Sequence, residues 1–431
     1  MVEINTPPTA ADLVIQGARE VVTCEPGPHN PLGIISEGVV AVVGGKIMAV
    51  GRSDEVRARM DLSGARILDI KGQTLAPGFV DCHTHVVFGG SRAREFSLKM
   101  TKSAAQIEAM GIQTGIPASI AMTRAAHEEH ILADSLARVQ RMFCCGSTTI
   151  ESKTGYGISV RDEDRLLKIN SLLQLRAKAD IVSTFTGAHD FPPEIDRNDP
   201  AARKRYMDLL INEMIPKAGD EGLAEFCDVY CDDGYYTAEE SRVILKAGMD
   251  HGLVPRIHTD AYANIGGSTM AAHLPTLTAD HLNYTTKAEM ALLAENKVIG
   301  VVLPALDFAV AHPDPVKAAD LIEAGVTIAL GTNLNPGNWT ESMQLVMQLA
   351  CRNHGLTLEQ AILAATLDAA RALGREKRIG SISPGKVADL QVWDITSLED
   401  IIYRLGHNAV TTVIKSGDIF TVPRHTDHLN G

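Results

Sequence analysis

Two histidines separated by one residue follow a short apolar segment near residue 80. Phe79-Val80-Asp81 is predicted as a strand, and His83-Thr84-His85 follows it directly. Residues i and i+2 of a strand project from the same face, so both imidazoles can reach a single cation. The pattern therefore predicts a metal site where this strand ends.

Further polar residues stand directly after other apolar segments. Each such segment is short enough to be a buried strand. If the strands run in parallel within one barrel, the side chains that follow them converge on one pocket. These residues are His189, His258, His281 and Asn333. We interpret the convergence of five histidines as a metal-assisted catalytic site.

The middle of the chain has the texture of alternating strands and helices. Apolar segments such as residues 148–150 and 298–303 are separated by long stretches with helical spacing. Such a repeat over about 300 residues predicts a (β/α)8 TIM barrel, here over residues 77–380. A doubly wound sheet is the alternative, but the sequence has no Gly-rich dinucleotide fingerprint to support it.

Both ends of the chain are rich in short β segments. Residues 39–43 and 46–50 flank a Gly44-Gly45 pair, which predicts a hairpin. Similar segments return at residues 385–393 and 410–414. We expect one small β-sandwich domain built from residues 1–76 and 381–431.

The composition argues against nucleic-acid-binding, membrane and secreted proteins. The 431 residues carry a net charge of −13, which gives no electrostatic footprint for nucleic acid or an anionic membrane surface. No apolar run has membrane-span length, and the opening MVEINTPPTA lacks the features of a signal peptide. Seven cysteines are too few for a disulfide scaffold. We expect a cytoplasmic enzyme with neither a nucleic-acid nor a membrane partner.

Several longer motifs resemble the imidazolonepropionase family of the amidohydrolase superfamily, over nearly the whole chain. The motifs are His83-Thr84-His85 with the following residues to Arg92, Lys153-Thr154-Gly155-Tyr156-Gly157, Gly187-Ala188-His189, residues 212–216, Ala279-Asp280-His281-Leu282 and Asn335-Pro336-Gly337. The resemblance implies a metal-dependent hydrolase of a C–N bond, or a nearby ring carbon, in a small cyclic amide that bears a carboxylate. It also implies a homodimer.

The resemblance assigns roles to individual residues. The metal ligands would be His83, His85 and His258, with Asn333 on or near one divalent ion, zinc or iron. Arg92 would hold the substrate carboxylate through its bidentate fork. His281, beside Asp280, would handle protons. Substrate contacts would come from Tyr156, His189, Asn335, Gly337 and Trp339.

Three positions depart from the family pattern. Ala261 stands where the family has an acidic residue, three positions after His258. Asn333 replaces the aspartate that serves as the fourth ligand and takes a proton from the attacking water. Trp339 adds a bulky aromatic side chain after Asn335-Pro336-Gly337. Loss of an acid–base carboxylate should slow hydrolysis by about 10²–10⁴-fold unless another group replaces it.

Four explanations of these departures remain open. Asn333 could be an engineered substitution, or the chain could bind a ligand without turnover. The chain could be a hydrolase with a displaced base, namely Asp260, Asp280 or His281, acting on a related ring such as a thio-imidazolone that loses sulfide. Alternatively, it could catalyse metal-assisted cyclodehydration, closing a ring in a small aromatic amide or ester with loss of water.

Overall fold

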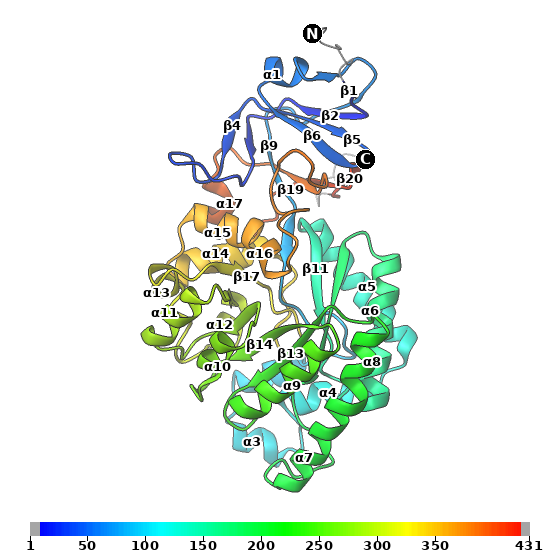
Figure 1. Ribbon diagram of the computed structural model, residues 1–431, viewed down its shortest axis with the longest axis vertical. Coiled ribbons are helices and arrows are strands. Elements are labelled where there is room, and N and C mark those ends of the chain that lie inside the picture. Colours follow the sequence, from blue (N-terminus) through cyan, green and yellow to red (C-terminus); the bar gives the residue numbers. More distant parts are fainter. Residues whose placement is uncertain (1–8, 424–431) are drawn as a thin grey trace.

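An eight-stranded parallel sheet organises the middle of the chain in this computed structural model, which describes residues 9–423 (Figure 1). Its neighbouring strands follow one another in sequence order, and the first and last strand ends also meet, because the Asn333 N–H donates to the His83 carbonyl at 2.9 Å. The strands are β10 (Phe79–Asp81), β11 (Ser147–Lys153), β12 (Asp180–Ala188), β13 (Phe226–Cys231), β14 (Val254–Thr259), β15 (Thr278–His281), β16 (Ile299–Val302) and β17 (Ile328–Leu330). This arrangement confirms the predicted (β/α)8 barrel.

Helices connect the barrel strands and surround them. The barrel strands are buried on both faces, as expected for parallel strands covered by helices. The helices are α2 (Ala93–Lys99), α3 (Ala104–Ala109), α4 (Gly115–Ala125), α5 (Glu128–Cys144), α6 (Val160–Arg176), α7 (Pro200–Leu209), the π-helix η1 (Leu210–Met214), α8 (Ile215–Asp220), α9 (Ala238–Asp250), α10 (Gly267–His273), α11 (Lys287–Glu295), α12 (Pro304–Ala309), α13 (Ala318–Glu323), α14 (Met343–Asn353), α15 (Leu358–Ala364) and α16 (Leu367–Ala372).

Local sequence signals explain where several of these helices begin. Thr237 caps α9 by accepting a hydrogen bond from the Glu240 N–H, while the Glu240 carboxylate accepts from the Thr237 N–H. Thr286 and Glu289 form the same capping box at the start of α11. Such reciprocal bonds satisfy backbone donors that the first helical turn leaves unpaired.

The two ends of the chain together form a β-sandwich-type unit, above the barrel in Figure 1. One sheet has the order β20 (Asp418–Thr421), β19 (Val410–Lys415), β18 (Leu390–Trp393), β9 (Thr74–Pro77), β3 (Glu20–Val22) and β4 (Ile34–Ser36). The other has the order β6 (Lys46–Gly51), β5 (Val39–Val43), β2 (Leu13–Gln16) and β8 (Arg66–Asp69). The smaller elements are β1 (Thr9–Ala10), β7 (Met60–Asp61), α1 (Ser53–Arg57) and α17 (Asp400–Tyr403).

Apolar side chains from both ends of the chain share the core of this unit. Ile15 and Val40 from the N-terminal part pack in one buried cluster with Leu390 and Ile414 from the C-terminal part. The predicted hairpin is also present, since β5 and β6 pair antiparallel and Gly44 and Gly45 both have positive φ. The division at residues 76/77 and 380/381 stays a prediction.

Two further expectations concern the environment of the chain. No helix within residues 9–423 is long and apolar enough to cross a membrane. All seven cysteines are free thiols. The prediction that there is no signal peptide rests on residues 1–10, most of which lie outside the described residues.

Candidate metal centre and active site

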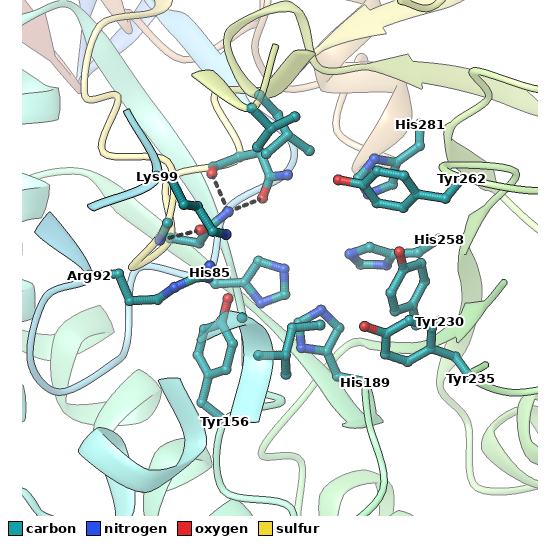
Figure 2. A pocket seen from close by; sticks show the side chains of 17 residues that line it. His85, Arg92, Lys99, Tyr156, His189, Tyr230, Tyr235, His258, Tyr262 and His281 are labelled. Carbon is teal, nitrogen blue, oxygen red and sulfur yellow. Dashed lines mark hydrogen bonds between the residues drawn. The ribbon is translucent and has the colours of Figure 1, made fainter. Parts of the chain in front are cut away.

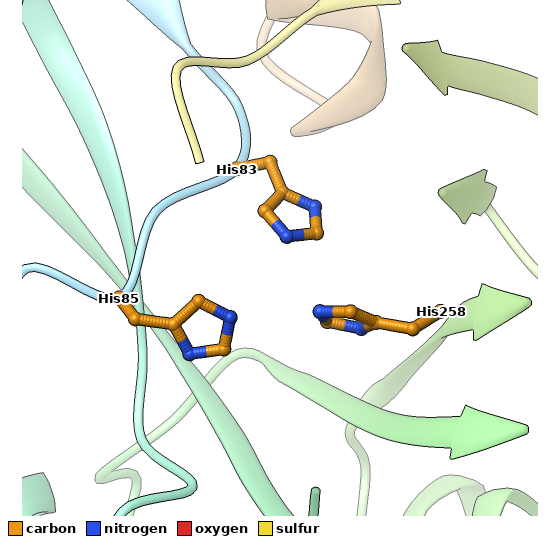
Figure 3. A group of neighbouring side chains, drawn as sticks. All are labelled: His83, His85 and His258. Carbon is orange, nitrogen blue, oxygen red and sulfur yellow. The ribbon is translucent and has the colours of Figure 1, made fainter. Parts of the chain in front are cut away.

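Three buried imidazoles converge at the end of the barrel strands. His83 and His85 follow β10, and His258 lies on β14, directly across the barrel (Figure 3). One nitrogen from each ring lies within 4.8 Å of the nitrogens of the other two. Burial lowers the pKa of all three imidazoles well below the ordinary value, so each ring is in the neutral form that can bind a metal.

Hydrogen bonds behind the rings fix which nitrogen faces the centre. The Nδ1 atom of His83 lies 2.6 Å from Asp280 Oδ2, and that of His258 lies 2.9 Å from Asp228 Oδ1. His85 donates from Nδ1 to the Thr154 carbonyl at 3.2 Å. Carboxylate or carbonyl partners of this kind orient metal-binding histidines.

The opposite ring nitrogens fit a divalent cation. Nε2 of His83 and Nε2 of His258 are buried and have no hydrogen-bond partner among the described residues. A buried polar atom without a partner is costly unless a ligand or ion satisfies it. The donor set of three neutral imidazoles is one that zinc and iron both accept.

A second group of potential ligands beneath this centre already contains a cation. Asp228, His258 and Asp280 bring their ligand atoms together. The Lys153 ammonium, however, lies 2.6 Å from Asp228 Oδ2 and 2.8 Å from Glu151 Oε1, with no exposure to solvent. Although burial opposes it, the neighbouring carboxylates raise the pKa of Lys153, so its charge is retained. The Lys153 ammonium therefore already balances the carboxylates of this second group.

A cavity of about 460 Å³ opens directly above the histidines (Figure 2). Nine of the residues predicted from the sequence line it together, although they come from all parts of the barrel. They are His85, Arg92, Tyr156, His189, His258, His281, Asn333, Asn335 and Gly337. His83 lies against this group, with its ring centroid 4.6 Å from that of His258.

Two residues predicted for the site are not brought to the cavity. Asp280 is fully buried behind His83, where its carboxylate also lies 3.5 Å from the Arg256 guanidinium. Trp339 lies on the outer surface, with its ring edge-on to Phe88 and its Nε1 donating to Glu341. Asp280 is therefore placed to hold His83, and Trp339 does not touch the cavity above the histidines.

Asn333 follows β17 in a conformation that non-glycine residues seldom adopt. Its φ is +48°, and comparable positive values occur at Asp260 and His281, which also end barrel strands. The Asn335 amide donates to Asn333 Oδ1 at 3.0 Å, so this oxygen is already partnered. Backbone strain of this kind persists where the surroundings hold it, and it is common at functional sites.

His281 and His189 supply neutral imidazoles to the cavity wall. Burial lowers the pKa of each to about 4. His189 stacks on His85 with centroids 4.6 Å apart, and its Nδ1 donates to the Gly155 carbonyl. Both rings are therefore available as proton acceptors near neutral pH.

Arg92 already has a carboxylate partner within the chain. Its Nε and Nη2 donate to the two carboxylate oxygens of Glu95 at 2.7 and 2.6 Å. Glu95 also pairs with Lys99 at 2.6 Å and accepts from the Gly115 N–H. The bidentate edge expected to hold a substrate carboxylate is thus occupied, which leaves Nη1, beside Gly337, for other contacts.

Sequence reasoning missed several residues of the cavity wall. Lys99, Tyr230 and Tyr262 line it, together with the apolar side chains Ile116, Leu306 and Val310. Tyr230 stands two positions after Asp228 on β13, so both side chains lie on the same face of the strand. This alternation could have predicted that Tyr230 faces the inside of the barrel. Tyr235 also lines the cavity, whereas Tyr236 is stacked on Phe191 in the core.

The wall of the cavity carries no acidic side chain among the described residues, since none of those that line it is aspartate or glutamate. Asp260, considered as a displaced base, is turned away, since its carboxylate accepts from the hydroxyls of Ser268 and Thr285. Ala261 does not line the cavity, and its carbonyl lies 2.8 Å from His312 Nε2.

Comparison with known proteins gives consistent results. Residues 237–420 match the model of the amidohydrolase family. The chain is 41% identical to an imidazolonepropionase from Geobacillus kaustophilus over 421 residues, which cover 94% of this chain and 97% of the relative. It is 38% identical to an imidazolonepropionase from Shouchella clausii over 418 residues, covering 94% and 92% of the two chains.

Solved structures with lower identity share the fold. A zinc-bound adenosine deaminase from Xanthomonas campestris superposes with a TM-score of 0.67 at 22% identity, covering 96% of this chain and 94% of that one. N-isopropylammelide isopropylaminohydrolase from Burkholderia multivorans gives 0.67 at 19% identity, covering 95% and 98%.

Proposed function

Because this chain belongs to the imidazolonepropionase family of metal-dependent amidohydrolases, we propose that it cleaves a ring C–N bond, or acts at a nearby ring carbon, of imidazolone propionate or a close analogue. The observation that carries this proposal is the convergence of three neutral imidazoles with two unpartnered Nε2 atoms beneath a cavity. The substrate is a small cyclic amide, and the natural ring can be the oxygen or the thio form.

We propose one resident divalent ion, zinc or iron, held by His83, His85 and His258, with the Asn333 amide beside it. Such an ion polarises a carbonyl and lowers the pKa of a bound water. The hydrogen bonds that His83 and His258 donate to Asp280 and Asp228 hold these two rings in the tautomer that presents Nε2.

The remaining side chains bind the substrate and handle protons. His281 takes a proton from the attacking nucleophile and returns it to the departing ring nitrogen. It is the one displaced-base candidate that reaches the cavity wall. Tyr156 and His189 contact the ring, Asn335 and Gly337 form the opposite wall, and Arg92 offers Nη1 to a carboxylate or other acceptor.

A product assay tests hydrolysis directly. Metal-loaded protein and a metal-stripped control are incubated with imidazolone propionate and with its 2-thio analogue, and the products are identified by mass spectrometry. We expect metal-dependent addition of water, or release of sulfide. No change in either substrate, with metal still bound, would contradict the hydrolase proposal.

A second candidate function is supported by the absence of carboxylates from the described cavity wall. Cyclodehydration adds an internal N–H or O–H to an amide or ester carbonyl and then expels water. It needs a polarised carbonyl and a proton carrier such as His281, but no base aimed at an external water. Aromatic ortho-hydroxy amides tested in the same assay would lose 18 mass units, about one water, if this candidate is correct.

Two properties of the whole protein are also proposed. We expect a homodimer, which the family resemblance supports and sedimentation can test. We expect a cytoplasmic location, supported by seven free cysteines in the described chain. A protein that binds its ligand without turnover remains the non-enzymatic alternative, and turnover of any substrate in the product assay would exclude it.

A further inference from the structure

The cavity above the histidines does not end at Arg92. A recess of about 290 Å³ adjoins it and shares Arg92, Lys99, Val310 and Gly337 with its wall. A groove of about 460 Å³ follows and shares Arg92, Phe96, Ala309 and Gly337 with the recess. Because each space shares wall residues with the next, the three spaces lie in series around Arg92 and Gly337, from the metal centre to the surface, and we call this series the path.

The outer groove has walls of a different character from the inner cavity. It lies between α2, α12, α14 and the loop after β17, and its side chains are mainly apolar. Three aromatic residues in it are unusually open to solvent: Phe96 is 55% exposed, Phe308 67% and Trp339 46%. Large exposed apolar groups that gather around one groove indicate a binding surface.

Trp339 is held firmly although its ring is half exposed. Its ring packs edge-on against Phe88 with centroids 5.4 Å apart, and the Arg138 guanidinium lies 5.1 Å from the ring centre. Its Nε1 donates to Glu341 at 3.1 Å. A preorganised aromatic wall of this kind loses little conformational entropy when a ligand covers it.

Arg92 packs closely on Gly337 at the boundary between the inner cavity and the outer groove. A Cβ atom at Gly337 would lie 2.6 Å from Arg92 Nη1, so any other residue would press against the guanidinium. Glu95 holds the Nε–Nη2 edge of that guanidinium and offsets its charge. Because Arg92 is already paired with Glu95, it does not require a carboxylate from the ligand. A neutral segment that forms hydrogen bonds can therefore lie beside Arg92.

We propose that this path binds an arm of the substrate, so that the reacting ring carries a polar linker beside Arg92 and an apolar aromatic group between Phe96, Phe308 and Trp339. This inference rests on the proposed function, because the reacting end is placed at the metal centre. It names a substrate class that is longer and less charged at its far end than imidazolone propionate.

The binding of unreactive analogues tests whether the path binds an apolar arm, independently of turnover. The probes are two amides of 3-(imidazol-4-yl)propionate, the N-methyl amide and the N-(3-phenylpropyl) amide, added to the metal-loaded protein. They carry the same charge and lack the reactive ring carbonyl. We expect the phenylpropyl amide to bind at least about tenfold more tightly, as burial of a phenyl group predicts.

Intrinsic fluorescence shows where the arm binds. The chain has two tryptophans, and Trp393 is fully buried, so a change on ligand binding reports Trp339. The phenylpropyl amide should shift the emission to shorter wavelength, whereas the methyl amide should not. Trp339→Phe should abolish the shift, since only the buried tryptophan then remains.

Matched variants complete the test. Phe308→Ser and Phe96→Ser should each remove most of the affinity difference between the two amides. Tyr403→Ser is the control, since Tyr403 is 74% exposed on α17 and does not line the groove. Equal affinities for the two amides, or a difference that survives both groove variants, would overturn the proposal.

Two other outcomes separate this inference from its alternatives. If the phenylpropyl amide binds more tightly but imidazolone propionate is not turned over, the proposed hydrolysis is wrong, whereas the proposed binding of an apolar arm is supported. If Trp339 emission changes with protein concentration and not with the phenylpropyl amide, a second copy of the chain covers the groove and the arm proposal is wrong.

Discussion

The imidazole of His83 and the carboxylate of Asp280 form a 2.6 Å hydrogen bond at a point where neither side chain is exposed. The same carboxylate lies 3.5 Å from the guanidinium of Arg256 and 3.7 Å from the ammonium of Lys153. His83 is therefore attached to a network of buried charges that extends under the whole metal centre.

Replacing Asp280 by asparagine should weaken metal binding without removing a ligand. The amide cannot accept from His83 Nδ1 as strongly, so the ring is less well oriented, and a loss of about 10–100-fold in metal affinity is expected. Competition with a chromophoric chelator measures the affinity. Asp418→Asn, at an exposed position on β20, is the matched control, and unchanged affinity in Asp280→Asn would contradict this role.

Restoring a carboxylate at position 333 should raise ring opening of imidazolone propionate. Asn333→Asp places a proton acceptor beside the proposed metal, and such groups contribute about 10²-fold or more. Steady-state rates at neutral pH provide the test. Asn335→Asp adds the same charge to the same loop and serves as the control. No gain in Asn333→Asp would indicate a pocket adapted to another substrate or to ring closure.

The Arg92–Glu95 pair predicts opposite effects of two substitutions on a substrate that bears a carboxylate. Arg92→Ala should raise KM about tenfold or more, because it removes a charge-assisted donor. Glu95→Gln should lower KM, because it frees the bidentate edge of Arg92. Kinetic measurements with imidazolone propionate distinguish the two. An Arg92→Ala variant with altered kcat and an unchanged KM would refute the anchoring role.

Lys153 should be essential for the fold beneath the metal centre. Lys153→Met leaves the buried carboxylates of Glu151 and Asp228 without their shared cation, so a loss of about 3–5 kcal/mol in the free energy of unfolding is expected. Urea unfolding gives this quantity. Lys168→Met is the comparison, because the Lys168 side chain is 56% exposed and Asp164 keeps a second partner in Lys217, so this pair should contribute less than about 1 kcal/mol. Similar losses in the two variants would contradict the argument.

The Glu95 carboxylate should make stability depend on pH in acid. Burial opposes ionisation, but hydrogen bonds from Arg92 and Lys99 lower its pKa from the ordinary 4.5 to about 2. Its stabilising contribution, on the order of 1–2 kcal/mol because solvent screens this partly exposed pair, is therefore complete above pH 4.5 and is lost as the pH falls towards 2. The pH dependence of urea unfolding should be smaller by this amount in Glu95→Gln, and identical profiles would exclude it.

Most residues of the cavity could be predicted from the sequence, because side chains that follow parallel strands must meet at the same end of the barrel. His83, His85 and His258 follow from alternation and from the parallel order of the strands, both of which the fold preserves. Trp339 could not be placed in the same way, because it lies in an irregular loop whose direction depends on Asn335 and Asn338. Lys99 reaches the cavity from a surface helix, where nothing in the local pattern distinguishes it from an ordinary solvated lysine.

The seam between the first and last barrel strands has a consequence for how the protein matures. The Asn333 N–H donates there to the His83 carbonyl, 250 positions earlier in the chain. The Thr332 N–H donates in the same way to Asp81, which is 251 positions away. Contacts between residues so distant in sequence form late, since the intervening chain must first be ordered. The loop after β17 that carries Asn333 is the last segment of the site to be synthesised, so a nascent chain cannot present the complete site until synthesis has passed it. The complete cavity wall therefore forms only when this seam has closed, even though the three histidines all lie earlier in the chain.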